Sequence, residues 1–342
     1  MNILKQIRYL FLYFCTIVHT FLLSTTQPWS WYYVDTIKQE EKSVLNCTIA
    51  HEAQPFTQLI FSWNANRPKK GWFTLFVQAR DTHTHTWSSW HKAIEWGRNK
   101  QISYTSSSDG IASYEHVRFE VEKGKKCDAF RVRVLPNAGA SIKDMHRIAV
   151  SCSDFTHFVP ENIHDYTSLS SVHIKQVPKR SQFSLSHPEK ERLCSPTSCA
   201  MIVAFLTKRS VAMSSFASQI YDPALDTYGN WAFNMAHAHT CVPHIWFCVR
   251  RLNSFKELHA YLLKGFPVVV SVRGTLAGAP QAYNNGHLLV VIGYDAQKKK
   301  VLCHDPAFKS DYLTFHAYDL KSFLRAWECS RRLAYCLETR SK

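Results

Sequence analysis

Residues 191–203 read ERLCSPTSCAMIV, so a short polar patch with two cysteines runs directly into an apolar segment. Pro196 fits the first turn of a helix, because the amide hydrogen that proline lacks has no partner there. Cys194 would then lie at the start of this helix, where the macrodipole and the unpaired N–H groups favour a thiolate. Cys199 would lie well inside the helix, about 140° around it, and fits a core position or a disulfide better. The stretch predicts a helix with a candidate nucleophile at its N-terminus. The alternative is that this cysteine is an ordinary buried thiol.

The remainder of the second half alternates between helical and strand patterns. The segment 253–265, NSFKELHAYLLKG, has Asn253 or Ser254 as a possible N-cap and Gly265 as a C-cap. Strand-like runs follow in FPVVVSVRG, GHLLVVIGYD and KVLCHDP, and YDLKSFLRAWE is again helical. We therefore predict an α+β domain over residues 172–342.

Two of these strand-like runs predict a hairpin that brings an imidazole to a carboxylate. The loop between them centres near Ala296 or Gln297. Residues equidistant from the turn of an antiparallel hairpin face each other, so His287 would lie opposite positions 305 to 307, where Asp305 stands. A carboxylate on Nδ1 of a histidine fixes its tautomer and supports its protonated form. The order of Cys194, His287 and Asp305 is that of papain-like cysteine hydrolases.

The first half has the pattern of an all-β protein. Over residues 35–154, short apolar, aromatic and β-branched runs such as LIFSW, WFTLFVQAR and AFRVRVL alternate with turn segments. These features predict a β-sandwich, followed by an irregular polar linker at 155–171. Trp87, Trp90 and Trp96 could stack on sugar rings, but core packing is the more frequent role of such residues.

The N-terminus predicts export. In residues 1–27, Lys5 and Arg8 precede an apolar stretch from Tyr9 to Leu23, which has the layout of a secretory signal without a clear cleavage site. An uncleaved anchor is the alternative. Ten cysteines follow Cys15, and in an oxidising compartment we expect some of them to pair.

The net charge of +15 favours acidic partners. However, the basic residues are scattered and no zinc-finger spacing or RNA-binding motif accompanies them, so we expect no nucleic-acid partner. No close CxxC pair is present, and we expect no structural zinc site.

The sequence blocks of the second half resemble those of cysteine peptidase family thirty-nine, the bacteriocin-processing peptidases. From about residue 174 to 336, VPKRSQ, CSPTSCAMIVAF, YGNWAFNMA, KGFPVVVSV, GHLLVVIGYD and HDPA occur in the family's order. The stand-alone branch of secreted bacterial members is the more similar one. The first half also resembles the sandwich domain that often precedes this peptidase domain, through FTQLIFSWNANRP, WSSWHKAIEWG and RIAVSCS.

The resemblance implies a role for four residues. Cys194 would be the nucleophile, His287 the general base and Asp305 the orienting acid, and Gln182 would help to hold the oxyanion together with the Cys194 backbone N–H. The exporter branch has an aspartate before its cysteine, whereas this chain has Leu193. This difference puts specificity for double-glycine leaders in doubt.

These observations predict a secreted cysteine peptidase that needs no metal or organic cofactor and acts on a peptide or protein. We expect it outside the cytoplasm of a bacterium, secreted or at the periplasm or cell envelope, with the sandwich contacting a substrate or an envelope component and only the signal segment contacting a membrane. An acyltransferase of the transglutaminase or phytochelatin synthase kind would use the same triad. A non-catalytic adhesion protein on a peptidase scaffold is the other alternative.

Overall fold

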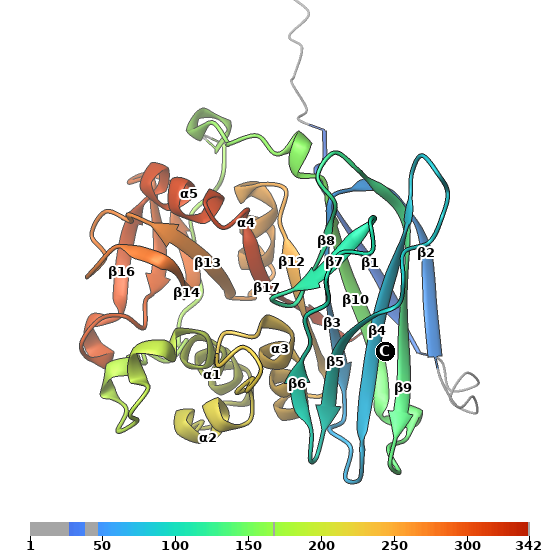
Figure 1. Cartoon of the computed structure of the whole chain (residues 1–342). Coiled ribbons are helices and arrows are strands. Elements are labelled where there is room, and N and C mark those ends of the chain that lie inside the picture. Colours follow the sequence, from blue (N-terminus) through green and yellow to red (C-terminus); the bar gives the residue numbers. More distant parts are fainter. Residues whose placement is uncertain (1–26, 38–46, 167, 341–342) are drawn as a thin grey trace, which may run out of the picture.

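The computed structural model describes residues 27–37, 47–166 and 168–340, which form two adjoining domains (Figure 1). The predicted signal segment, residues 1–27, lies outside this description except for its last residue. Among the described residues, no helix is long and apolar enough to cross a membrane.

The first domain is the expected β-sandwich, made of two five-stranded antiparallel sheets. One sheet has the order β1-β10-β3-β8-β7 and the other β2-β9-β4-β5-β6. Alternate residues of each strand face inward, as Phe73, Leu75 and Val77 do in β4, and these side chains are fully buried. The strands are β1 (Ser30–Thr36), β2 (Cys47–Phe56), β3 (Gln58–Ala65), β4 (Trp72–Asp81), β5 (His91–Gly97), β6 (Gln101–Ser103), β7 (Ala112–Glu115), β8 (Arg118–Val121), β9 (Cys127–Asn137) and β10 (Met145–Ser153).

The three tryptophans of the WSSWHKAIEWG segment have different environments. Trp96 lies in the sandwich core against Trp63, as core packing predicts. Trp87 and Trp90 are half-buried, and the guanidinium groups of Arg131 and Arg133 lie 3.8 and 4.0 Å from the centres of their rings. The faces of these two rings are therefore already stacked on cations.

The second domain is built on a seven-stranded antiparallel sheet, so the α+β prediction is confirmed. The main path of the sheet is β12-β17-β13-β14-β15-β16, and β11 pairs with β14. In Figure 1, α1 to α3 lie below this sheet and α4 and α5 above it. The helices are α1 (Cys194–Thr207), α2 (Met213–Ser218), α3 (Trp231–Cys241), α4 (Phe255–Leu263) and α5 (Leu320–Glu328), and the strands are β11 (Val172–His173), β12 (Ile245–Arg251), β13 (Val268–Gly274), β14 (Tyr283–Asp295), β15 (Lys300–His304), β16 (Phe315–Asp319) and β17 (Leu333–Thr339).

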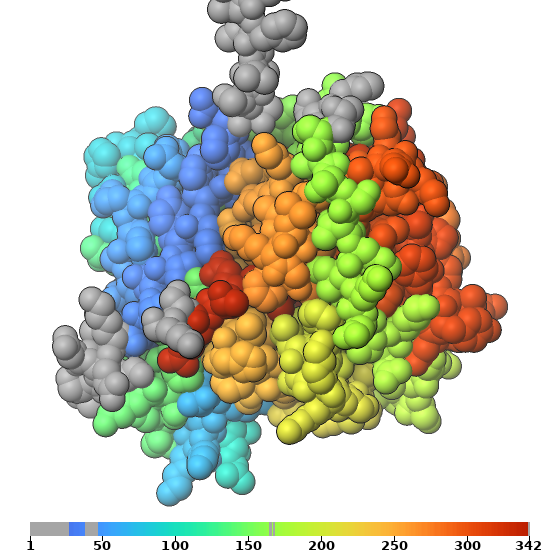
Figure 2. All heavy atoms as spheres, turned by 180° about the vertical axis from the view of Figure 1, so that it is seen from behind, coloured from blue at the N-terminus to red at the C-terminus, as the bar shows by residue number. Residues whose placement is uncertain are grey.

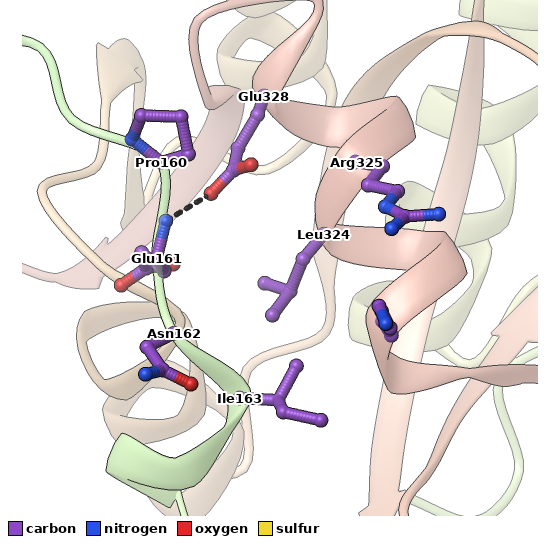
Figure 3. A pocket seen from close by; sticks show the side chains of 8 residues that line it. Pro160, Glu161, Asn162, Ile163, Leu324, Arg325 and Glu328 are labelled. Carbon is purple, nitrogen blue, oxygen red and sulfur yellow. Dashed lines mark hydrogen bonds between the residues drawn. The ribbon is translucent and has the colours of Figure 1, made fainter.

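The predicted linker is bound to the second domain rather than standing free of it. The Glu161 backbone N–H donates to the Glu328 carboxylate at 2.7 Å, beside a pocket between this segment and α5 (Figure 3). The Glu161 carboxylate in turn accepts from the Phe255 N–H at the first residue of α4, and Arg332 donates to the Val159 carbonyl. Seen from behind, the chain after the sandwich runs between the region of α4 and the C-terminal elements (Figure 2).

The two domains meet at the edge strand β12. The outward N–H groups of Phe247, Val249 and Arg251 would be unpaired there, but they donate to side-chain oxygens of the sandwich at 2.7 to 3.2 Å. These acceptors are Asn64, Ser62 and Ser151. Asn64 also donates through its amide to the Phe247 carbonyl at 2.7 Å, so one side chain imitates a strand partner. An exposed sheet edge is thereby covered within the chain.

The expectation of disulfides is wrong for the cysteines whose pairing is described. Apart from Cys47, the described cysteines are free thiols, and most of them are buried in the sheets or in α1. Cys248 and Cys336 lie directly opposite each other on β12 and β17 but remain unbonded.

Asn64→Ala tests the domain junction. The change leaves the backbone N–H and C=O of Phe247 buried without partners, and we expect the free energy of unfolding to fall by about 2–4 kcal/mol in urea titrations. The control is Asn66→Ala, because the Asn66 side chain is exposed just after the end of β3. This change should alter the free energy of unfolding by less than about 0.5 kcal/mol. Equal effects of the two changes would mean that Asn64 does not support the junction.

Candidate active site

Cys194 is the first residue of α1, as the sequence predicts. Its side chain is half-buried, whereas residues 195–203 behind it are buried. The Ser198 hydroxyl donates to the Leu288 carbonyl at 3.1 Å and so ties α1 to β14. The Ser195 hydroxyl lies 3.0 Å from the hydroxyl of Tyr335 on β17. These contacts fix the N-terminus of the helix on the central strands of the sheet.

His287 on β14 joins this cysteine to a buried carboxylate. Its side chain is buried, and its Nε2 lies 2.7 Å from Asp305 Oδ1. The imidazole is also hydrogen-bonded to the Cys194 thiol. The carboxylate therefore contacts Nε2 rather than the predicted Nδ1, and Nδ1 remains for the sulfur. The Tyr283 ring stacks on the imidazole, with centroids 4.1 Å apart and an interplanar angle of 16°.

Asp305 is fully buried and accepts four hydrogen bonds. Its Oδ1 accepts from His287 and from the Ala307 N–H at 2.9 Å. Its Oδ2 accepts from the hydroxyls of Tyr283 and Tyr318, both at 2.6 Å. A carboxylate in a dry site is stable only when its lone pairs are matched by donors and a nearby cation, and this one has both.

The predicted hairpin exists, and its register agrees with the expected pairing of His287 with positions 305 to 307. Asp295 pairs with Lys300, and a bulge interrupts the pairing between Val291 and Gly293. Extended along the same ladder, His287 would face position 307 rather than Asp305. Asp305 reaches the imidazole because it lies just beyond the end of β15, where the chain turns.

The three groups stabilise one another's charged forms. Burial opposes a thiolate at Cys194, but the hydrogen bond and charge of His287 bring the pKa of the thiol below its usual value of 9.0. Burial likewise opposes an imidazolium, yet Asp305 and Cys194 together raise the pKa of His287 to about 10. Burial would also raise the pKa of Asp305, and the His287 cation and the tyrosine hydroxyls hold it below its usual value. The arrangement therefore favours a thiolate–imidazolium pair beside an ionised carboxylate.

Gln182 is hydrogen-bonded to the segments that carry Asp305 and Cys194, but it makes no hydrogen bond to the thiol or the imidazole. Its backbone N–H donates to the Pro306 carbonyl at 3.0 Å, next to Asp305. Its side-chain amide donates to the Glu191 carbonyl at 3.0 Å, three residues before Cys194. An amide nitrogen carries two hydrogens, so one N–H of Gln182 remains for another acceptor.

The thiol and the imidazole open into a cleft of about 900 Å³. Residues of both domains line it, including Gln58, His116 and Arg118 of the sandwich. The pocket in Figure 3, between residues 160–163 and α5, is separate from this cleft and has neither cysteine nor histidine in its lining.

Comparison with known proteins assigns the two halves of this sequence to family models. Residues 174–335 match the model of the Peptidase_C39 like family, and residues 33–141 match that of the Peptidase C39 N-terminal domain. The chain belongs to the C39-like peptidases. It is therefore a cysteine-type peptidase, and its substrate is a peptide or a protein.

Two further comparisons add little to this assignment. Among solved structures, the C39-like chain aligns with xylellain, a cysteine protease from Xylella fastidiosa, at 11% identity and a TM-score of 0.31, over 54% of this chain and 91% of that one. No curated protein matches the chain.

The two tyrosines that bind Asp305 were not among the predicted site residues. Tyr283 lies four residues before His287 on the same strand, and strand alternation could have placed both on one face. Tyr318 lies on β16, thirteen residues after Asp305, and no local spacing points to it.

Asp305→Asn tests the electrostatic coupling. In the native chain the thiolate should persist below pH 9 and be lost only as the pH falls through the lowered pKa of Cys194. Removing the carboxylate charge withdraws the support of the imidazolium, so the pH profile of Cys194 alkylation by iodoacetamide should move to higher pH.

The matched control for this experiment is His304→Ala. The His304 ring contacts the Pro178 carbonyl and Phe315 rather than the triad. Its replacement should leave the alkylation profile in place, and a shift with His304→Ala but not with Asp305→Asn would contradict the assignment.

Proposed function

We propose that the chain hydrolyses peptide bonds with Cys194 as nucleophile, His287 as acid and base, and Asp305 as the orienting carboxylate. The observation that carries this proposal is the continuous hydrogen-bonded line from Cys194 through His287 to Asp305 at the cleft. A nucleophile, a base within hydrogen-bond reach and a third group that orients the base are the arrangement that covalent hydrolysis requires.

The first half-reaction forms a thioester. The Cys194 sulfur attacks the carbonyl carbon of the substrate, and the carbonyl oxygen becomes an oxyanion. The His287 imidazolium gives its Nδ1 proton to the leaving amine as the C–N bond breaks. Asp305 holds the Nε2–H throughout and keeps the ring oriented between the sulfur and the substrate.

The second half-reaction releases the acid product. His287, now neutral, accepts a proton from water while the water oxygen attacks the thioester carbonyl. The C–S bond then breaks, and the thiolate–imidazolium pair is restored. In both steps the oxyanion would accept from the Cys194 backbone N–H and from the N–H of Gln182 that Glu191 does not occupy.

Acyl transfer is the competing reaction on the same groups, with an amine or thiol replacing water in the second step. The products decide between the two: hydrolysis in water enriched in oxygen-18 places the label in the new carboxyl group, whereas transfer gives an amide or thioester product without it.

We also propose that the protein is exported and that the outer face of its sandwich contacts an anionic component of the envelope. The proposal is supported by the N-terminal sequence, by the net charge of +15, and by the guanidinium groups that Arg131 and Arg133 present over Trp87 and Trp90. Recovery of the protein only from the cytoplasm, with residues 1–27 intact, would contradict export.

Gln182→Ala tests the oxyanion role. Loss of one donor should lower kcat for peptide cleavage by about 10²- to 10³-fold. The rate of Cys194 alkylation by iodoacetamide should stay unchanged, because that reaction forms no oxyanion. A variant that loses both reactivities in parallel would show that Gln182 acts by holding the Glu191 segment in place.

A further inference from the structure

The floor of the catalytic cleft runs away from His287 across the edge of the central sheet. Leu288 pairs with Ser271 on β13, and Arg251 on β12 pairs with Leu333 on β17, the strand between β12 and β13. All four residues line the cleft. Three strand spacings of about 4.8 Å separate β14 from β12, so this floor is about 14 Å long. An extended peptide covers that distance in about four residues.

The far end of the floor is occupied by a buried cation. Arg251 is only 5% exposed. Its Nε donates to Gln58 of the sandwich at 2.9 Å, and one terminal nitrogen donates to the Ser330 and Arg331 carbonyls at 2.8 and 3.0 Å. The second terminal nitrogen makes no hydrogen bond to any described residue, and no described carboxylate lies within ion-pair distance of Arg251.

Two further guanidinium groups line the same end of the cleft. Arg118 from β8 of the sandwich pairs with Glu120 at 2.8 Å, and Glu120 also accepts from Gln58. Arg331 is exposed, lies 4.8 Å over the Phe158 ring, and has no ion-pair partner among the described residues. Of the three guanidinium groups at this end of the cleft, only that of Arg118 therefore has a carboxylate partner.

Such a cluster is electrostatically incomplete. Burial, together with the charges of Arg118 and Arg331, lowers the pKa of Arg251 to about 9, although Glu120 opposes this effect. A buried cation without a counterion is costly, and an anion that enters from the cleft would relieve that cost. The planar, forked guanidinium group matches a carboxylate best.

We propose that Arg251, Arg331 and Arg118 form a subsite that binds a carboxylate of the substrate, about four residues from the bond to be cleaved. This inference rests on the proposed function and adds its substrate class: peptides that carry an acidic side chain or a terminal carboxylate at that distance. Arg118 and Gln58 come from the sandwich, so the first domain contributes directly to specificity.

Fluorescence anisotropy of labelled peptides on the full chain tests the subsite without requiring catalysis. The neutral reference is a glutamine-containing peptide with both ends blocked. One arm replaces a glutamine by glutamate at each position in turn, and the other unblocks the C-terminal carboxylate. The arm that gains affinity identifies the source of the carboxylate, and we expect a gain of about tenfold or more that falls with added salt.

The variants Arg331→Gln and Arg251→Gln should abolish this preference, whereas Arg98→Gln, at an exposed arginine outside the cleft, should keep it. If Arg251→Gln fails to fold, two results still test the subsite. These are the affinities of Arg331→Gln and the salt dependence of binding to the native chain. Equal affinity for acidic and neutral peptides, or no binding of either acidic arm, overturns the proposal.

Failure of the proposed function has a different signature. In that case iodoacetamide would not alkylate Cys194 faster than the other thiols, and this result would not depend on the peptide affinities. An acidic peptide that binds the subsite should also protect Cys194 from iodoacetamide, because the cleft is continuous between them.

Discussion

The burial of the Asp305 carboxylate is the constraint on which the site depends. With no exposed surface, this group is stable as an anion only because two tyrosine hydroxyls, a backbone N–H and an imidazole donate to it. Its charge then makes imidazolium the favoured form of His287, which in turn supports a thiolate at Cys194. The strands that carry Tyr283, His287 and Tyr318 and the turn after β15 must all be in place before the pair can form. The chemistry of the site thus depends on the completed sheet.

Hydrogen bonds to otherwise unpaired backbone groups also join the two domains. β12 ends the sheet of the peptidase domain, and Ser62, Asn64 and Ser151 of the sandwich accept from its outward N–H groups. The junction places Gln58 and Arg118 beside β12, so the sandwich forms part of the cleft wall. A covered strand edge and a shared cleft therefore come from one packing arrangement.

The parts of the site that depend on local sequence patterns could be predicted from the sequence. Pro196 and the apolar run placed Cys194 at a helix start, and two strand-like runs brought His287 to Asp305. The loop centre at Gln297 also gave the hairpin register beside His287, although the bulge between Val291 and Gly293 has no clear signal in VVIG. Tyr318 and the arginines of the cleft could not be assigned from spacing, since only the tertiary fold brings β16 and β12 to the site. The burial of Ser62 and Asn64 on β3 is a property of the domain junction, which no local pattern reports.

Ultraviolet absorbance of the thiolate tests most directly whether Cys194 and His287 form an ion pair. The difference spectrum between the native chain and Cys194→Ala isolates one sulfur, and it is measured over a pH titration. We expect a thiolate signal that is already present below pH 9 and is lost as the pH falls through the lowered pKa of Cys194. A signal that first appears near pH 9, as for an ordinary thiol, would contradict the ion pair between Cys194 and His287 on which the account depends.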